Sequence, residues 1–431
     1  MSTRARSLLC RPGLRGRPGA GHRLAAVALA LIGLTATTAT PADESARHRL
    51  PEPVRIGLDA DLSKSSALGG EAIRRGAELA IAELNARGGV LGRPLELVAR
   101  DNRRNPARGA DNVAELARMP DLVAVIGGMS TPVAVAVAPV AQHDRLVYLV
   151  PWAPGEAVLG HSTGPGYVFR LGPNDADTGA LLVHSALARG HRRPGLALWR
   201  TARGRALEST IQVRLGELGL PRAPVAWLDT DQSDMAESVD NLLTAGADLI
   251  LVAAGPRESG ALVREVARRP SLMRLPIISD SSLTGGSFHD EHGELLDRVE
   301  LSFLQTYSFL SSRHPERARE VVEAYCERFR VCRAEAIPAP MGTAHAYDLV
   351  HLLARAITAA GSVDRPRVRD ALERIEVHHG LVRDYLRPFS AMDHEALGED
   401  DHRLFAFSAN GAVVPVDRRD GARRPARVPG V

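Results

Sequence analysis

The chain has 431 residues, of which 45% are hydrophobic and 24% charged, as in an ordinary soluble protein with room for two full-sized domains. Its formal net charge is only +3, and Lys64 is the sole lysine, so the positive charge is almost all arginine. No basic run interleaved with aromatic residues occurs in the body of the chain, which argues against a nucleic-acid partner.

The first 42 residues have the layout of a secretory signal peptide. An arginine-rich start precedes the apolar segment Leu24–Leu34 and the small residues of Thr35–Ala42. The apolar segment is shorter than the roughly 20 residues that a membrane-spanning helix needs. We therefore expect an exported protein, with a retained membrane anchor as the alternative.

Strands and helices alternate along the first part of the remaining chain. Apolar runs predict strands at 54–58, 95–99, 122–126 and 146–150, and apolar residues at helical spacing predict helices at 69–85, from 106 and from 131. This alternation with short connections predicts a doubly wound parallel sheet.

The stretch Val123–Pro154 contains the first candidate binding site. Gly127 and Gly128 end a buried strand, and Ser130 and Thr131 precede a proline, which is the composition of a helix start. Such a βαβ unit places both strand ends and the helix N-terminus at one edge of the sheet. Backbone N–H groups and two hydroxyl groups there could hold a carboxylate or another acceptor, although an ordinary helix cap has the same pattern.

A second α/β unit of similar plan follows. It has predicted strands at 168–171, 196–199, 225–228, 249–253, 276–279 and 301–305, and helices at 181–187, 205–218, 235–243 and 258–267. The last part has helices at 315–329, 343–359 and 365–375 and a hairpin at 404–416 with Asn410-Gly411 in its turn. Residues 417–431, rich in arginine and proline, predict a disordered tail.

Cys326 and Cys332 remain once a leader containing Cys10 is removed, and export would permit a disulfide between them. Six residues apart on one continuous helix, the two side chains would point to different faces. A helix that ends near Phe329 would let the chain turn and bring them together. The sequence leaves both arrangements open.

Motifs of catalysis and of metal binding are weak. No GxSxG, HExxH or P-loop sequence occurs after the leader. His289 and His292 could share a helical face as a metal pair, but no third ligand accompanies them, and an exposed polar loop is the favoured interpretation. We expect no enzyme activity, no metal and no cofactor.

The chain resembles a known family, the type I periplasmic substrate-binding proteins of ABC importers, and in particular its leucine/isoleucine/valine-binding branch. The most specific match is Leu62-Ser63, Gly69 and then RRGAELAIAELNARGGVLGRPLELVARDN, which runs from Arg74 to Asn102. Further matches in order are Ile126-Gly127 with Ser130, Phe169-Arg170, Gly204, Asp234, Asp248 and Ala346-Tyr347-Asp348.

The resemblance implies two Rossmann-like lobes with parallel sheets, joined by three crossovers, with the ligand in the cleft between them. Hinge motion closes such lobes on a ligand, a movement for which periplasmic binding proteins serve as a standard example. The first lobe would comprise residues 54–170 and 307–387, and the second 171–306 and 388–416.

The resemblance also implies ligand-binding residues on both lobes. On the first lobe these are Met129, Ser130, Thr131, Trp152 and Ala153, and on the second Arg203, Arg257, Asp280 and Ser281. Pro154 and Ser281 depart from the family pattern, the first at a hydroxyl position and the second where an acidic residue is usual. These departures put branched-chain amino acids in doubt, and Arg203 or Arg257 would suit an acidic ligand instead, unless they are solvated surface residues.

We therefore expect a periplasmic, monomeric receptor that captures a small polar solute, namely an amino acid, an amide or a small carboxylate, and delivers it to the membrane permease of an ABC importer. The alternative is a sensing domain that presents its solute to a separate membrane receptor. A transcriptional regulator of this fold would need an N-terminal DNA-binding helix pair, where this chain has its predicted leader.

Overall fold

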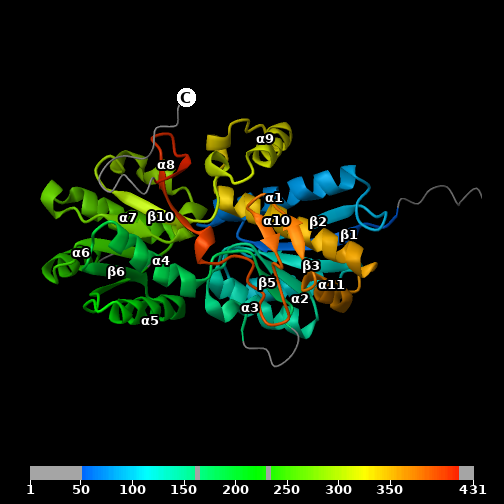
Figure 1. Cartoon of the computed structure of the whole chain (residues 1–431), viewed down its shortest axis with the longest axis horizontal. Helices are drawn as coiled ribbons and strands as arrows, with labels where there is room; N and C mark the ends of the chain where they lie inside the picture. Colours follow the sequence, from blue (N-terminus) through cyan, green and yellow to red (C-terminus); the bar gives the residue numbers. More distant parts are fainter. Residues whose placement is uncertain (1–50, 161–165, 230–233, 417–431) are drawn as a thin grey trace, which may run out of the picture. The chain divides into compact units, whose positions relative to one another are not determined.

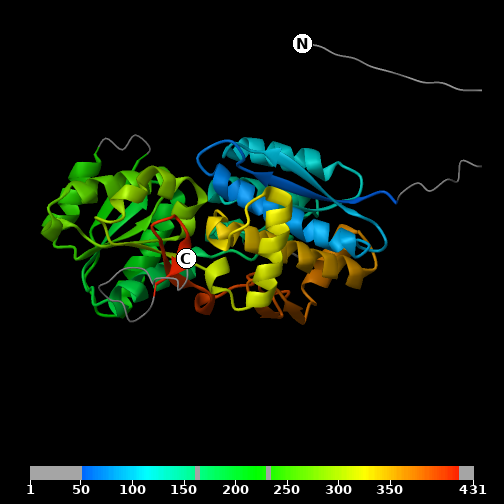
Figure 2. The same cartoon turned by 90° about the horizontal axis from the view of Figure 1, so that it is seen from above.

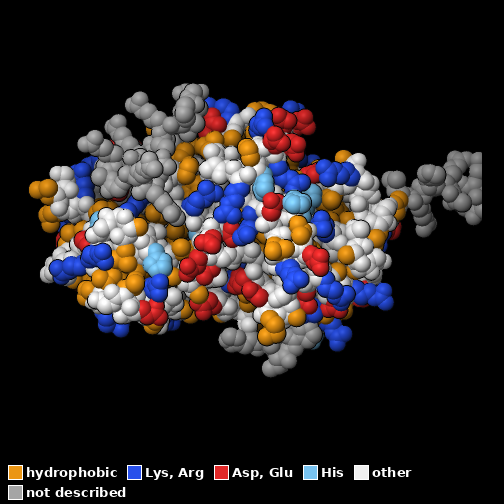
Figure 3. Space-filling model, in the orientation of Figure 1, with side chains coloured by type: hydrophobic (Ala, Val, Ile, Leu, Met, Phe, Trp, Pro, Cys, Tyr) orange, Lys and Arg blue, Asp and Glu red, His pale blue; other side chains and the backbone are white. Residues whose placement is uncertain are grey.

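The computed structural model describes residues 51–160, 166–229 and 234–416 (Figures 1 and 2). The predicted signal peptide and the predicted tail lie outside the described residues. Within the described ranges, no helix is long and apolar enough to cross a bilayer. Basic and acidic side chains are interspersed over the face seen in Figure 3, in keeping with the small net charge.

The first sheet has five strands in the order β2-β1-β3-β4-β5, and every pairing in it is parallel. Its strands are β1 (Val54–Ala60), β2 (Leu95–Asp101), β3 (Leu122–Gly127), β4 (Val147–Val150) and β5 (Val168–Arg170). All of β3 and β4 is buried, which explains why these strands are continuous apolar runs.

Helices cover both faces of this sheet. On one face lie α1 (Ala67–Ala86), α10 (Pro340–Ala360) and α11 (Arg365–Leu372), and on the other α2 (Pro106–Ala117) and α3 (Thr131–His143). α1 and α10 lie side by side (Figures 1 and 2), so the late part of the chain returns to the first sheet. Gly76 makes this close approach possible, because a methyl group there would overlap the carbonyl oxygen of Thr343.

The second sheet has seven strands in the order β14-β13-β10-β9-β8-β6-β7. Its parallel strands are β6 (Pro194–Trp199), β7 (Val225–Leu228), β8 (Leu249–Ala253), β9 (Ile277–Ser279) and β10 (Leu301–Gln305). The hairpin of β13 (Arg403–Phe407) and β14 (Val413–Pro415) adds an antiparallel edge.

The second sheet is also covered on both faces. Ile250 and Val252 of β8 pack in the layer of α6 (Met235–Thr244) and α7 (Pro256–Arg268). Leu249 and Leu251 pack with α4 (Asp175–Ala188) and α5 (Ala202–Glu217). The period-two alternation of a strand thus divides one apolar run between two cores. The two-lobed α/β architecture expected from the sequence is confirmed.

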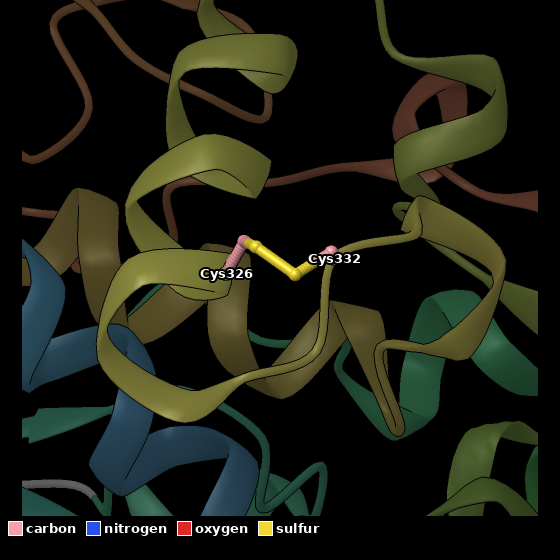
Figure 4. Close-up of a disulfide and its surroundings, with 2 residues drawn as sticks. All are labelled: Cys326 and Cys332. Atoms are coloured by element: carbon pink, nitrogen blue, oxygen red, sulfur yellow. A yellow bond between two sulfur atoms is a disulfide. The ribbon is translucent and has the colours of Figure 1, made fainter.

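Helix α9 (Pro315–Phe329) ends between the two cysteines, so Cys326 lies in the helix and Cys332 beyond it. Arg330, its C-cap, has φ of 62°, in the left-handed region, and the chain reverses there. Cys326 and Cys332 are bonded to each other (Figure 4). Of the two arrangements that the sequence leaves open, the structure has the disulfide.

The predicted elements correspond closely to those of the structure, with ends that differ by a few residues. Some features have no counterpart in the prediction. They include the small hairpin of β11 (Val377–His379) and β12 (Asp384–Leu386), the short helix α8 (Phe288–His292) and the short 3₁₀ helices. Neither strand of that hairpin lies in an apolar run of the sequence.

Candidate functional site

The predicted binding residues all follow the carboxyl ends of strands. Met129, Ser130 and Thr131 follow β3, and Trp152 and Ala153 follow β4. In the second sheet Arg203 follows β6, Arg257 follows β8, and Asp280 and Ser281 follow β9. In open α/β sheets, ligands bind in the crevice outside the carboxyl ends of the strands.

Residues of the two sheets' loops meet around Gly285, the last residue of the short 3₁₀ helix Ser281–Gly285 (η4). A methyl group on Gly69 of α1 would lie 2.7 Å from Sδ of Met129 and 3.2 Å from Cα of Gly285. A methyl group on Gly285 would overlap Met129 and lie 4.0 Å from the Trp152 ring. We call Gly69, Met129, Gly285 and Gly286 the seam, because η4 there contacts the loops of the first sheet.

Gly286 extends this contact. A methyl group there would lie 2.8 Å from the carbonyl oxygen of Ser65, which precedes α1, and 2.9 Å from Pro256, which begins α7. The missing Cβ atoms of the seam glycines therefore let the backbones of the two halves approach each other.

Ser130 and Thr131 differ in their surroundings. Ser130 is the half-buried N-cap of α3, and its side chain makes no capping hydrogen bond. Thr131 is buried, and its hydroxyl oxygen accepts a hydrogen bond of 3.2 Å from the N–H of Gly155. The structure thus gives Thr131 a role in fixing the loop after β4, in addition to any contact with a ligand.

The loop that carries Trp152 and Ala153 is fastened by Arg170. This buried guanidinium donates 3.2 Å and 2.9 Å hydrogen bonds to the carbonyl oxygens of Ala153 and Gly155, and it forms an ion pair with Glu395. Phe169-Arg170 is one of the sequence matches to the family, and here the arginine has a structural role.

Trp152 is completely buried, and its indole nitrogen Nε1 has no hydrogen-bond partner among the described residues. The ring packs against the start of α10, where a methyl group on Gly342 would lie 2.9 Å from ring atom Cζ3. A buried N–H group without a partner costs free energy.

Arg203 and Asp280 are paired with each other and with Asp175. Nη2 of Arg203 lies 2.8 Å from Oδ1 of Asp175 and 2.7 Å from Oδ2 of Asp280. Burial alone would lower the pKa of Arg203, but the charges of the two aspartates reverse this effect and raise it. The cluster has two negative charges and one positive, which argues against Arg203 as the receptor of an acidic ligand.

Ser281 and Arg257 are the other two predicted residues of the second sheet's loops. Ser281 is buried, and its carbonyl oxygen accepts a hydrogen bond of 2.9 Å from the hydroxyl of Thr284. Arg257 is exposed in the first turn of α7.

Glu258, Trp199 and Arg104 lie close together, although the sequence did not predict that they would. Glu258 is buried, and its Oε2 has no hydrogen-bond partner among the described residues. Trp199 lies beside it, near Gly255. The guanidinium of Arg104, from the first sheet, lies 4.6 Å from the centroid of the Trp199 ring.

Arg104 could have been found from its place after a strand. It follows β2 as the other predicted residues follow their strands. Its φ of 60° is in the left-handed region, and the side chain donates a 2.7 Å hydrogen bond to Oγ of Ser65. Burial lowers the pKa of Arg104, an effect that the charges of Glu258 and Asp61 oppose. The group therefore contains a cation–π contact between the two sheets.

A buried carboxyl group lies at the end of β1, in the middle of the first sheet. Asp59 accepts hydrogen bonds of 2.9 Å from Asn102 and 2.8 Å from Asn112. Burial raises its pKa to about 6 against the opposing effect of these two bonds. Burial also raises the pKa of the neighbouring Tyr148, and the charge of Asp59 adds to this rise. This group fixes the strand ends below the site.

The two histidines considered as a metal pair are separated by their packing. His292 is buried against Gly260 of α7, whereas His289 packs against Phe407 and Gly411. The expectation of an exposed polar loop is wrong, because the segment forms α8 and its packing buries Phe288 and His292. Among the described residues no group of three or more His, Cys, Asp or Glu could hold a metal ion. A separate hollow of about 760 Å³ lies between α10 and α11, bordered by Arg355, Arg367 and Arg374, and none of the predicted site residues lines it.

Known proteins with similar sequences and structures bear on this arrangement. The family model for periplasmic binding proteins matches residues 53–403. Leu/Ile/Val-binding protein homolog 2 of Brucella abortus is 24% identical over 329 residues, covering 74% of this chain and 82% of the relative. The substrate-binding protein BasB of a chemotactic signal transduction system in Halobacterium salinarum is 24% identical over 353 residues, covering 79% and 80%.

A solved structure supports the same fold. The type 1 periplasmic binding protein of Bordetella pertussis Tohama I has a TM-score of 0.74 and 24% sequence identity, covering 85% of this chain and all of that one. The family match spans most of the chain, and the two sheets with their covering helices have the fold of that structure. The chain therefore belongs to the periplasmic binding protein family, with the type I fold.

Proposed function

We propose that the protein is a non-enzymatic receptor that captures a small polar solute between two lobes and delivers it to the permease of an ABC importer. The lobes are 54–170 with 307–387 and 171–306 with 388–416, and the protein acts as a monomer in the periplasm after removal of a signal peptide. Met129, Ser130, Thr131, Trp152 and Ala153 form one wall, and Arg203, Arg257, Asp280 and Ser281 belong to the other.

The observation that carries the proposal is a pair of buried polar atoms that have no hydrogen-bond partner among the described residues. The indole N–H of Trp152 is a donor on the first wall, and Oε2 of Glu258 is an acceptor on the second. Both residues lie near the seam: atom Cη2 of the Trp152 ring is close to Gly285, and Pro256, two residues before Glu258 in α7, is close to Gly286. A ligand with both an acceptor and a donor, such as an amino acid or an amide, would satisfy both groups.

The charge distribution refines the class of ligand. Because Asp175 and Asp280 already neutralise Arg203, a purely anionic ligand would meet a net negative cluster on the second wall. A zwitterion or a neutral amide avoids this repulsion. Among the ligands expected from the sequence, these classes are therefore favoured over small carboxylates.

A thermal-shift screen with amino acids, amides, ureas and small carboxylates tests the proposal. A ligand present at 100 times its Kd stabilises the folded state by about 2.7 kcal/mol, which raises the melting temperature by several degrees. Trp152→Phe and Glu258→Gln should each reduce this shift for the ligand that is found. Trp227→Phe is the control for the first variant, because Trp227 packs on the α4–α5 side of the second sheet.

A result without any stabilising ligand, combined with turnover of one of the compounds, would contradict the proposal and indicate an enzyme. The alternative use of the same capture step is sensing, as in the chemotactic relative. Loss of ligand-dependent uptake in cells without the protein would support transport, whereas loss of a tactic response with uptake intact would support sensing.

A further inference from the structure

His345 lies completely buried in α10 and uses both of its ring nitrogens. Nδ1 lies 2.6 Å from the carbonyl oxygen of Pro151, and Nε2 lies 2.7 Å from Oγ1 of Thr306. A carbonyl oxygen can only accept, so Nδ1 carries the hydrogen and Nε2 accepts from the threonine hydroxyl. Burial lowers the pKa of His345 to about 4, which keeps the ring neutral near pH 7.

The two partners of His345 belong to different sheets. Pro151 follows β4 of the first sheet and directly precedes Trp152. Thr306 follows Gln305, the last residue of β10 in the second sheet. Nε2 of Gln305 donates a 2.6 Å hydrogen bond to Oγ1 of Thr284, a residue of η4 next to Gly285 in the seam. Polar contacts therefore run from η4 through Gln305, Thr306 and His345 to the loop that carries Trp152.

We propose that His345 is a positioning residue for ligand capture: it fastens the chain leaving β10 to the loop after β4 and so holds the two cleft walls together. His345 and Pro151 move as one body, since α10 packs on α1 along the first sheet. Rotation of the second sheet would change the backbone at each crossover, including the one where the chain leaves β10, and there it would withdraw the hydroxyl of Thr306 from Nε2. A buried nitrogen left without its donor opposes that movement.

The start of α10 also holds the ring of Trp152. Gly342, one turn before His345, lies under this ring, and Thr343 donates a 3.2 Å hydrogen bond to the carbonyl oxygen of Ala72 in α1. The backbone of the loop and the indole ring are thus positioned by one helical turn.

Hydrogen exchange of the ligand-free protein tests the proposal with Thr306→Val and the control Ser302→Ala. Each variant removes one buried hydroxyl of the segment 301–306, but Ser302 accepts its 2.8 Å hydrogen bond from Arg189 of its own lobe, whereas Thr306 bonds to His345. Loss of one hydrogen bond changes an opening equilibrium about fivefold. We expect exchange about fivefold faster in residues 62–70 and 281–286, which include three residues of the seam, for Thr306→Val alone, with β8 unchanged.

Three results would overturn the proposal. They are a seam that exchanges at the wild-type rate in Thr306→Val, an equal acceleration in Ser302→Ala, and an acceleration that includes β8 and so reflects global destabilisation. The proposal rests on lobe closure, but the test uses no ligand. The hydrogen-exchange result can therefore be interpreted even if the ligand screen finds no ligand.

Discussion

Arg203 and Asp280, two residues that the sequence assigns to the binding site, bind each other. Nη2 of the arginine lies 2.7 Å from Oδ2 of the aspartate. The side chains are 11% and 2% exposed, and Asp280 also accepts a 2.9 Å hydrogen bond from the hydroxyl of Ser282. The two side chains are thus paired with each other. This ion pair links the loop after β6 to the loop after β9.

Replacing Arg203 should therefore damage stability. Arg203→Met leaves the buried carboxylates of Asp175 and Asp280 without their cation, and breaking such a pair costs about 3–5 kcal/mol. Arg205→Met, at an exposed position of the same helix, should change the free energy of unfolding by less than about 0.5 kcal/mol. Urea unfolding measures both. Similar values for the two variants would contradict the assigned role of Arg203.

Two glycine-to-alanine substitutions, one at the seam and one away from it, should change the free energy of unfolding in opposite directions. Gly69→Ala would place a methyl group 3.2 Å from Cα and 3.3 Å from the carbonyl oxygen of Gly285, and these are backbone atoms that cannot move aside alone. Overpacking of this kind costs about 1–3 kcal/mol. Because the strain can be relieved by separating the walls, we expect a larger radius of gyration in solution scattering.

Gly216→Ala is the control for the seam. Gly216 is also helical, but nothing lies within 4 Å of a methyl group built there. This variant should gain up to about 1 kcal/mol of helix stability and keep the wild-type radius of gyration. An unchanged radius in Gly69→Ala would show that the contact does not limit closure.

The architecture was predictable because it rests on apolar patterns. The apolar runs of β3, β4 and β8 and the helical stripe of α1 are buried as those patterns indicate. The contacts of the seam glycines could not be predicted, because the sequence does not show which part of the backbone approaches a given glycine. Gly69 was recognised as a family match, whereas its contact with Gly285 emerges only from the folded chain.

The pairings among the proposed site residues were not predictable. The family resemblance named Arg203 as a site residue, but whether it faces solvent, a ligand or two aspartates depends on Asp175, which lies 28 residues away in the sequence. Glu258 and Arg104 come together with Trp199 only across the two sheets. Polar contacts of this range leave no periodic signal.

The disulfide should stabilise the end of α9. Closing so short a loop contributes about 2 kcal/mol in the chain-entropy estimate. The double variant Cys326→Ser/Cys332→Ser should unfold at lower urea concentration, and a reducing agent should shift the wild type toward the variant while leaving the variant unchanged. Alkylation of the denatured, unreduced protein followed by peptide mapping would contradict the bond if both cysteines were modified.

The carboxyl group of Asp59 makes stability depend on pH in a stated direction. Its pKa is raised by burial from 3.8 to about 6. Because the folded state binds the proton more tightly than the unfolded chain, the stabilisation is fully present below about pH 4. It is lost as the pH rises through about 6.

Urea unfolding of wild type and Asp59→Asn at pH 4.5, 5.5 and 7 isolates this contribution, since other titrating groups cancel in the difference. An amide cannot ionise, and it retains an oxygen that can accept from Asn102 or Asn112. The wild type should therefore lose about 2 kcal/mol relative to the variant between pH 4.5 and pH 7. A difference that stays constant would mean that Asp59 ionises as easily in the folded protein as in the unfolded chain, so that the two asparagine hydrogen bonds balance the burial of the charge. A difference that moves in the wild type's favour as the pH rises would mean that these hydrogen bonds outweigh the burial. Either result would contradict the prediction.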